Sequence, residues 1–175
     1  LEGLGEPHPL SPVELCRPRR IGSVELEALH PCNESGALLS ENDRSLVLRV
    51  TFGRVSILLT GDLEAAGERV LLQRSRGRLE ASVLKVAHHG SDTSSSEAFL
   101  AAVRPRLAIA SCGPSASRPL PHPAAAARIR RAGAFLLSTA ESGAVEVTTD
   151  GRGLVARTAR GGSVPIARHH SGPQR

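Results

Sequence analysis

Several residue types are absent or scarce in this 175-residue chain, and each scarcity narrows what the protein can be. The chain has no methionine, tryptophan or tyrosine, and it has only three phenylalanines. With so few aromatic rings, stacking of nucleic-acid bases on aromatic side chains is nearly excluded as a binding mode. Because the chain starts at Leu1 and contains no initiator methionine, we expect it to be a piece of a longer protein or a processed product.

Cysteines and long apolar runs are also scarce. Cys16, Cys32 and Cys112 form neither an even set nor a closely spaced pair. We therefore expect three free thiols, which argues against a disulfide framework and against a cysteine-based zinc site. No apolar run approaches the roughly 18 residues that a membrane-spanning helix needs. The sequence thus predicts a segment that has no membrane span of its own.

Lysine is the last scarce type, since Lys85 is the only one in the chain. The formal net charge is +5, so nearly all of the basic character comes from arginine. The planar guanidinium group suits phosphate, which makes a polyanionic partner possible. Arginines scattered over an ordinary surface would give the same composition, and charge alone does not separate the two interpretations.

The apolar pattern predicts a mixed α/β layout. The strand at 55–60 is almost continuously apolar, as in a strand covered on both faces. Three successive predicted strands end in polar loops, and sites in layered α/β folds gather at such ends. The expected strands are 24–29, 45–52, 55–60, 82–87, 107–111, 134–137, 144–148 and 154–157, and the expected helices are 63–74, 97–103 and 123–132.

The first of these polar loops carries Asp62, directly after Gly61. A carboxylate at the end of a buried strand, beside a glycine that allows a tight turn, can ligate a metal ion. Aspartate is also a favoured N-cap, so Asp62 could instead cap the helix that follows. Both interpretations stay open.

The second loop carries the pair His88 and His89. Neighbouring side chains of an extended chain point to opposite sides, so one imidazole can face a metal while the other faces solvent or a supporting group. A ligating ring needs an orienting partner on its other nitrogen, and Ser91, Asp92 or a backbone group could supply it. A histidine pair can also be incidental.

The third loop carries His122, immediately before the helix that begins at Pro123. The positive end of a helix dipole favours the neutral imidazole that a metal ion requires. The alternative is an ordinary histidine in a turn.

Taken in order, these motifs resemble one family. Over about residues 20–158 the sequence is similar to the C-terminal metallo-β-lactamase-like domain of the ComEC/Rec2 DNA-uptake proteins. The order of the motifs is specific, whereas each motif alone is weak. The motifs are residues 42–48, 58–62 and 83–91, a histidine-proline loop, and the turn at 141–144 before a terminal strand. We divide the chain into an irregular linker (1–20), the second half of this domain (21–158) and a disordered tail (159–175).

The resemblance implies a partial αββα sandwich, that is, an α/β fold with a mixed sheet and covering helices. It also implies a hydrolase that acts on DNA phosphodiesters with a divalent metal, zinc or manganese, and without a nucleotide cofactor. The implied partners are DNA and the membrane channel domain of the same polypeptide, which would make the segment a soluble domain of a bacterial inner-membrane protein. The implied catalytic residues are Asp62 and His88, and the candidate metal ligands are Asp62, His88, His89 and His122.

Two departures from the family pattern count against activity. The family's His-x-His-x-Asp-His ligand motif has no counterpart in this chain, and Leu120 stands where the histidine-proline loop of the family carries its ligand. Because leucine cannot coordinate a metal, we expect an incomplete site here unless His122 takes that position. Two alternatives to a nuclease therefore stay open: a degenerate module that contacts DNA or serves structure, and a small-molecule metallohydrolase such as a lactonase.

Overall fold

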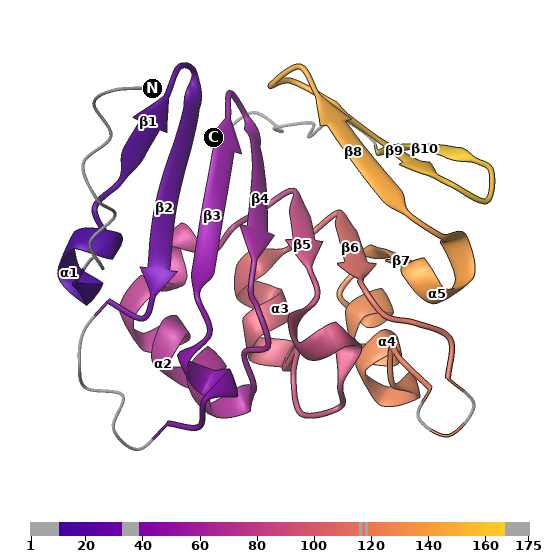
Figure 1. Ribbon diagram of the computed structural model, residues 1–175, viewed down its shortest axis with the longest axis horizontal. Coiled ribbons are helices and arrows are strands. Elements are labelled where there is room, and N and C mark those ends of the chain that lie inside the picture. The colour runs from indigo at the N-terminus through magenta and orange to yellow at the C-terminus, as the bar shows by residue number, and fades with distance from the viewer. Residues whose placement is uncertain (1–10, 33–38, 116, 118, 167–175) are drawn as a thin grey trace, which may run out of the picture.

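A seven-stranded mixed sheet forms the centre of the computed structural model, which describes residues 11–32, 39–115, 117 and 119–166 (Figure 1). The strands lie side by side in chain order, from β1 to β7. The first four pair antiparallel, and β4 to β7 pair parallel. The strands are β1 (Arg19–Ile21), β2 (Val24–His30), β3 (Val47–Phe52), β4 (Val55–Leu59), β5 (Val83–Lys85), β6 (Leu107–Ala110) and β7 (Phe135–Ser138).

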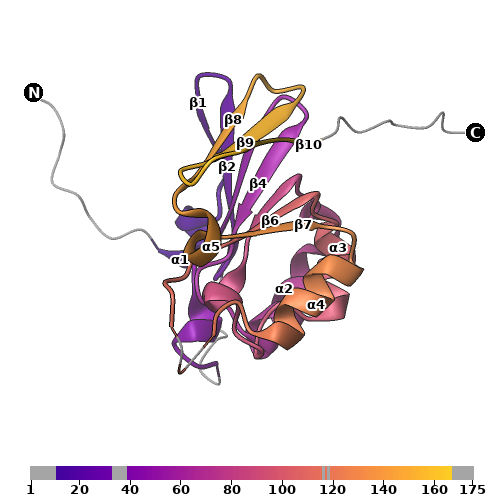
Figure 2. The ribbon, with the colours of Figure 1, turned by 90° about the vertical axis from the view of Figure 1, so that its right-hand side faces the viewer.

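Three helices, α2, α3 and α4, cover one face of this sheet (Figure 2). The larger hydrophobic core lies between the sheet and these helices. There Leu58 and Leu84 of the sheet pack against Leu71, Phe99 and Ile129 of the helices. Each of these five side chains is 1% exposed or less. The helical elements are α1 (Pro12–Leu15), η1 (Asn42–Arg44), α2 (Ala65–Ser75), η2 (Arg76–Arg78), η3 (Ala87–Gly90), α3 (Glu97–Val103), α4 (Pro123–Arg131) and α5 (Thr139–Ser142).

A small antiparallel sheet packs on the other face. It consists of β8 (Val145–Thr149), β9 (Leu154–Thr158) and β10 (Ser163–Ile166), and it lies over the β4–β7 half of the large sheet (Figures 1 and 2). A second core joins Val55, Val83 and Leu107 to Leu154 and Ala156. Because β4 to β6 are covered on both faces, most side chains on each face of these strands are apolar. The predicted partial α/β sandwich is confirmed.

The predicted helices and strands are found, with shifted ends, and the structure differs from prediction mainly at the two termini. Within the predicted irregular linker it has α1 and β1, and within the predicted disordered tail it has β10. Both short strands gain their order from pairing, β1 with β2 and β10 with β9, which a local pattern does not reveal. Residues 1–10 and 167–175 of the linker and tail lie outside the described residues. Across the described ranges no helix is long and apolar enough to cross a bilayer.

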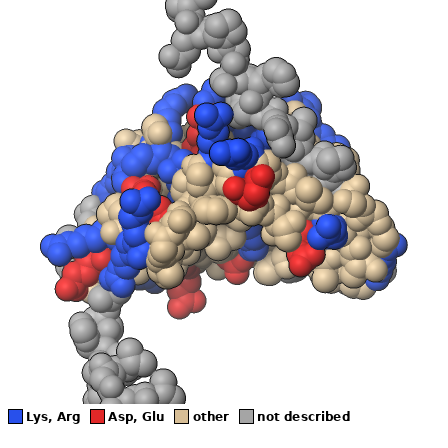
Figure 3. All heavy atoms as spheres, turned by 90° about the horizontal axis from the view of Figure 1, so that it is seen from above, with Lys and Arg blue, Asp and Glu red and all other residues tan. Residues whose placement is uncertain are grey.

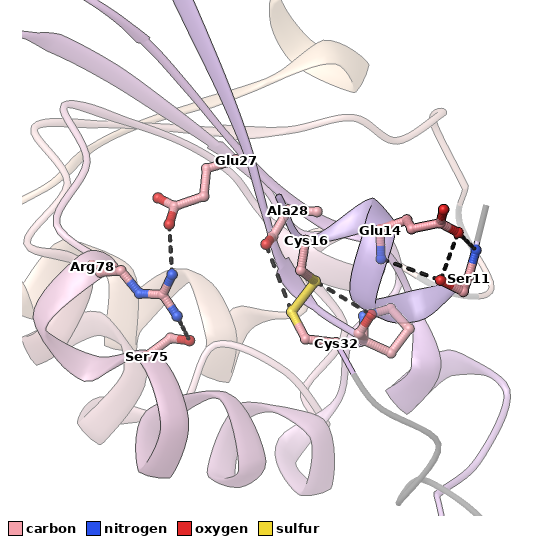
Figure 4. Close-up of a disulfide and its surroundings, with 9 residues drawn as sticks. Ser11, Glu14, Cys16, Glu27, Ala28, Cys32, Ser75 and Arg78 are labelled. Carbon is pink, nitrogen blue, oxygen red and sulfur yellow. Dashed lines mark hydrogen bonds and ion pairs between the residues drawn. A yellow bond between two sulfur atoms is a disulfide. The ribbon is translucent and has the colours of Figure 1, made fainter. Parts of the chain in front are cut away.

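The prediction of three free thiols is wrong for two of them. Cys16 and Cys32 form a disulfide with their Cα atoms 5.6 Å apart (Figure 4), and Cys112 is free. The antiparallel pairing of β1 with β2, with Arg19 opposite Leu26, brings the segments on either side of this hairpin together. The spacing of the cysteines could not reveal the bond, because the contact depends on the unpredicted strand β1.

We predict that the disulfide stabilises the folded chain by about 3 kcal/mol, the value expected for a closed loop of roughly 15 residues. The variant Cys16→Ser/Cys32→Ser should lose this amount in urea unfolding, and a thiol reductant should then have no further effect. Cys112→Ser is the control and should retain the sensitivity to reductant. Equal stability of the oxidised and reduced wild-type chain would contradict the assignment.

Candidate metal centre at the strand ends

The polar loops predicted from the sequence meet at one edge of the large sheet. Because β4 to β7 are parallel, the segments that follow them emerge at the same edge, at the lower end of the sheet in Figure 1. The described segments that contribute are 60–64, 86–91, 111–115, 119–122 and the start of α5. The structure therefore confirms that the three strand-end motifs converge.

Asp62 is held in a tight turn that leaves its carboxylate accessible. Its backbone N–H donates to the hydroxyl of Ser45 at 3.0 Å. Gly61 has a φ of +53°, and a Cβ atom there would lie 2.7 Å from the Cβ of Ser45, so only glycine fits. Thr60 is fully buried, and its hydroxyl donates to the carbonyl of Lys85 at 2.7 Å, which ties β4 to β5. The Asp62 side chain is 43% exposed.

Asp43, and not Asp62, caps helix α2. The N-cap residue is Glu64, whose side chain makes no capping bond. The buried Asp43 Oδ1 instead accepts from the N–H groups of Glu64 at 3.2 Å and Gly67 at 2.7 Å. The capping interpretation of Asp62 is thus wrong, because an aspartate from a distant part of the chain already satisfies these donors.

The histidine pair lies in a left-handed turn, and not on an extended chain. His88, His89 and Gly90 have φ values of 46°, 56° and 87°. Left-handed backbone costs a residue with a Cβ atom about 1–2 kcal/mol, so the surroundings must hold this turn. The N–H of His88 donates to the carbonyl of Gly61 at 3.1 Å, and the N–H of His122 donates to the carbonyl of Gly90 at 2.8 Å. A Cβ atom on Gly90 would lie 2.5 Å from the Cβ of Pro121.

His89 faces Asp62 with the nitrogen that can bind a metal ion. Its Nδ1 lies 2.7 Å from the carbonyl oxygen of Ser111, which can only accept, so Nδ1 carries the proton. Nε2 is the nitrogen left for a metal ion, and it lies 3.7 Å from Oδ1 of Asp62. A backbone carbonyl that orients the ring in this way is the usual support of a ligating histidine.

His88 points to a different partner. Its Nδ1 lies 3.1 Å from Oε1 of Glu64, and the same oxygen accepts from the hydroxyl of Thr93 at 2.8 Å. The centroids of the two imidazole rings are 6.3 Å apart. Glu64 was not among the predicted site residues, because at the start of a helix it resembles an ordinary first-turn acid. The signal that could have found it is its position two residues after Asp62.

Two polar side chains, one from α2 and one from α4, fix the loop that follows the histidines. Glu68 of α2 is fully buried and accepts from the N–H groups of Ser95 at 2.5 Å and Ser96 at 2.9 Å. From the other side, the guanidinium of Arg128 in α4 donates to the carbonyl oxygens of Asp92, Ser94 and Ser95. Burial raises the pKa of Glu68 above its ordinary value of 4.5, although the hydrogen bonds and Arg128 act to lower it. The loop is therefore held by side chains on two helices.

His122 and Leu120 take different positions at the edge. His122 is the N-cap of α4, and its Nδ1 accepts from the N–H of Ala124 at 3.3 Å. Leu120 lines a pocket of about 450 Å³ together with His89 and Cys112. The thiol of Cys112 donates to the carbonyl of Leu120 at 3.1 Å. Cys112 was predicted to be a free thiol, but it was not among the predicted site residues. Leu120 therefore shares a pocket with His89, whereas the Nδ1 atom of His122 is used to cap α4.

The chemistry of Asp62 and His89 fits a divalent metal ion as a pair of ligands, one hard oxygen donor and one neutral imidazole. Among the described residues, however, no three histidine, cysteine or acidic side chains are grouped closely enough to hold an ion. Lys85 adds a cation nearby, since its Nζ donates to the carbonyl of Gly61 at 3.1 Å. Burial lowers the pKa of Lys85, and the charge of Asp62 opposes that shift.

The fold and the strand-end loops define an α/β protein in which Asp62 and His89 face each other at one edge of the large sheet. Comparisons with known proteins assign the chain to a family. No protein-family model matches the chain. Competence protein ComA of Neisseria gonorrhoeae is 39% identical over 137 residues, which are 78% of this chain and 20% of that protein. Recombination protein 2 of Haemophilus influenzae is 42% identical over 108 residues, 62% of this chain and 13% of that protein. ComE operon protein 3 of Bacillus subtilis is 34% identical over 127 residues, 73% of this chain and 16% of that protein.

The chain therefore belongs to the ComEC/Rec2 family of competence and DNA-uptake proteins, and the resemblance drawn from its motifs is confirmed. It spans a fifth of the length of the first of these relatives and less of the other two.

We predict that Glu68 makes the stability of the fold depend on pH. Because the folded chain binds the Glu68 proton more tightly than the unfolded chain, the free energy of unfolding falls as pH rises through the interval above 4.5. Urea unfolding of the wild type and of Glu68→Gln, which cannot titrate, isolates this contribution. Relative to the variant, the wild type should lose stability between pH 5 and pH 7. A difference that stays constant or grows in the wild type's favour would contradict this.

Proposed function

We propose that this chain is the second half of a metal-dependent hydrolase domain that cuts DNA in a DNA-uptake protein. The observation that carries the proposal is the geometry of Asp62 and His89. A strand-end carboxylate faces an imidazole whose other nitrogen is already committed to a backbone carbonyl. The names of the relatives, a competence protein and a recombination protein, supply the choice of DNA as substrate.

In this proposal Asp62 and His89 hold the divalent cation, and His88 acts through Glu64. The carboxylate of Glu64 orients the His88 ring and keeps its proton on Nδ1, so that Nε2 is free to accept a proton from water or substrate. The bound cation supplies Lewis-acid stabilisation of the charge that develops on the phosphodiester. Catalytic zinc sites use three protein ligands, so two from this chain leave at least one to come from elsewhere.

The second candidate function is a non-catalytic module that contacts DNA, and Leu120 is the observation that favours it. Its side chain lines the same pocket as His89, at the position where the family resemblance expects a ligand. An apolar group there removes one donor, and a longer polypeptide would not restore it. The two candidates therefore differ in whether the rest of the protein completes the site.

The disulfide bears on where the domain works. Disulfides persist in oxidising compartments and are rare in the reducing cytosol. We infer that Cys16–Cys32 belongs to a domain of a membrane-bound uptake protein that lies outside the reducing cytosol, where incoming DNA would first meet it. The channel domain of the same polypeptide is then its neighbour.

The nuclease proposal predicts Mn²⁺-dependent cleavage of DNA by the longest polypeptide that carries this sequence. Asp62→Ala and His89→Ala should each lower the rate at least a hundredfold, because each removes a cation ligand. Glu97→Ala, an exposed change on α3, is the control and should leave the rate unchanged. Cleavage by the Asp62→Ala/His89→Ala variant at the original rate would refute the proposal.

Leu120→His separates the two candidate functions in the same assay. If the site needs only this donor, the variant should bind Zn²⁺ at least about tenfold more tightly by calorimetry and should cleave faster. Tighter zinc binding without any cleavage by either form would favour the non-catalytic module.

A further inference from the structure

A pocket of about 210 Å³ lies at the opposite edge of the large sheet from the candidate metal centre. It is formed where the parallel strands begin, beside Ser56 at the start of β4, Ser82 before β5 and Arg106 before β6. The five residues of β4 alone set the two edges about 17 Å apart. The pocket is therefore separate from the strand-end site, and nothing in the chemistry proposed above uses it.

The lining of this pocket, which we call the arginine pocket, is strongly basic. It carries four arginines, and Glu80, ion-paired with Arg104 at 2.6 Å, is the only carboxylate among its described lining residues. Basic side chains gather over this end of the molecule (Figure 3). The arginines are Arg49, Arg54, Arg104 and Arg106. Four guanidinium groups facing one carboxylate make the pocket suited to an anion.

Arg49 provides a donor that the described residues do not satisfy. Its Nε is buried and has no hydrogen-bond partner in the part of the chain that the structure describes. Leaving a buried donor unpaired is costly, and Arg49 carries this cost in a side chain that lines the pocket. Arg49 lies on β3 in register with Leu58 of β4, so its position is fixed by the sheet.

The other arginines are also carried by well-ordered backbone. The N–H of Arg54 donates to the carbonyl of Gly151 at 2.6 Å, which anchors the β3–β4 turn on the β8–β9 turn. Gly53 has to be glycine, because a Cβ atom there would collide with Gly151. The N–H of Arg106 donates to the carbonyl of Ser82 at 3.1 Å. The backbone that carries these two arginines is thus fixed by hydrogen bonds at the rim of the pocket.

We propose that the arginine pocket binds a phosphate of a nucleic-acid strand, as a second contact point remote from the metal centre. Guanidinium groups bind phosphate oxygens through paired hydrogen bonds. No aromatic side chain is among the described lining residues, so the contact reads the backbone and not the bases. The choice of a nucleic acid rests on the proposed function, whereas the anion site itself does not.

The test measures binding of the whole chain to a fluorescent 20-nucleotide oligothymidylate by anisotropy, in EDTA and over a salt series. Arg54→Gln/Arg104→Gln removes two exposed arginines from the pocket rim, which should weaken binding on the order of tenfold. The slope of log K against log salt should flatten by about 0.7 for each phosphate that the variant no longer neutralises. Arg69→Gln/Arg130→Gln is the matched control, with the same charge change on exposed faces of α2 and α4. Equal weakening by both double variants would overturn the proposal.

Ser82→Asp tests the pocket without weakening the fold. The new carboxylate would lie among the arginines in place of the phosphate, so thermal stability should hold or rise while oligothymidylate affinity falls at least tenfold. Unchanged affinity would overturn the proposal. The proposal would also be overturned if the pocket variants left oligothymidylate binding unchanged but weakened the binding of inorganic phosphate or of phosphatidylglycerol vesicles. Because EDTA removes divalent metal, these binding measurements are independent of the cleavage assays. Absence of cleavage would therefore contradict the proposed function but not the proposal for the arginine pocket.

Discussion

The buried carboxylate of Asp43 is the interaction on which the candidate metal centre depends. It accepts hydrogen bonds from the N–H groups that begin α2 and from the hydroxyl of Ser40, while the carbonyl of Asp43 lies 2.8 Å from Nε2 of His30. Position 67 requires glycine, because a Cβ atom there would lie 2.9 Å from the carbonyl oxygen of Asp43. The entry to β3 is thereby locked onto the first turn of α2, across more than twenty residues of sequence.

Two acids of the candidate centre, Asp62 and Glu64, are positioned next to this contact. Two residues after Asp43, Ser45 holds the backbone of Asp62, and Asp62 in turn faces His89. Glu64, whose N–H is capped by Asp43, orients His88. Each of the two histidines thus faces an acid of the same short turn. At the other end of the same strands lies a basic pocket, so the sheet separates the candidate metal centre from the arginine pocket.

The sequence predicted the mixed α/β layout and the polar loops at the strand ends, because apolar strands and helices have recognisable local patterns. The sequence did not predict contacts between segments that are far apart along the chain. The role of Asp43, the disulfide of Cys16 with Cys32 and the contact of Glu64 with His88 each depend on which segments the sheet brings together. The left-handed turn at His88 and His89 was missed for a related reason. Histidine has only a modest tendency to that conformation, and the surrounding backbone bonds impose it.

The most direct test of the account is the state of the His89 ring, read from long-range ¹H–¹⁵N NMR spectra of the chain during a Zn²⁺ titration. The account predicts that His89 carries its proton on Nδ1 and that zinc shifts the resonance of its Nε2, with the effect lost in Asp62→Ala. A ring protonated on Nε2, or zinc shifts confined to His88 or His122, would contradict the claim that Asp62 and His89 form the preorganised ligand pair.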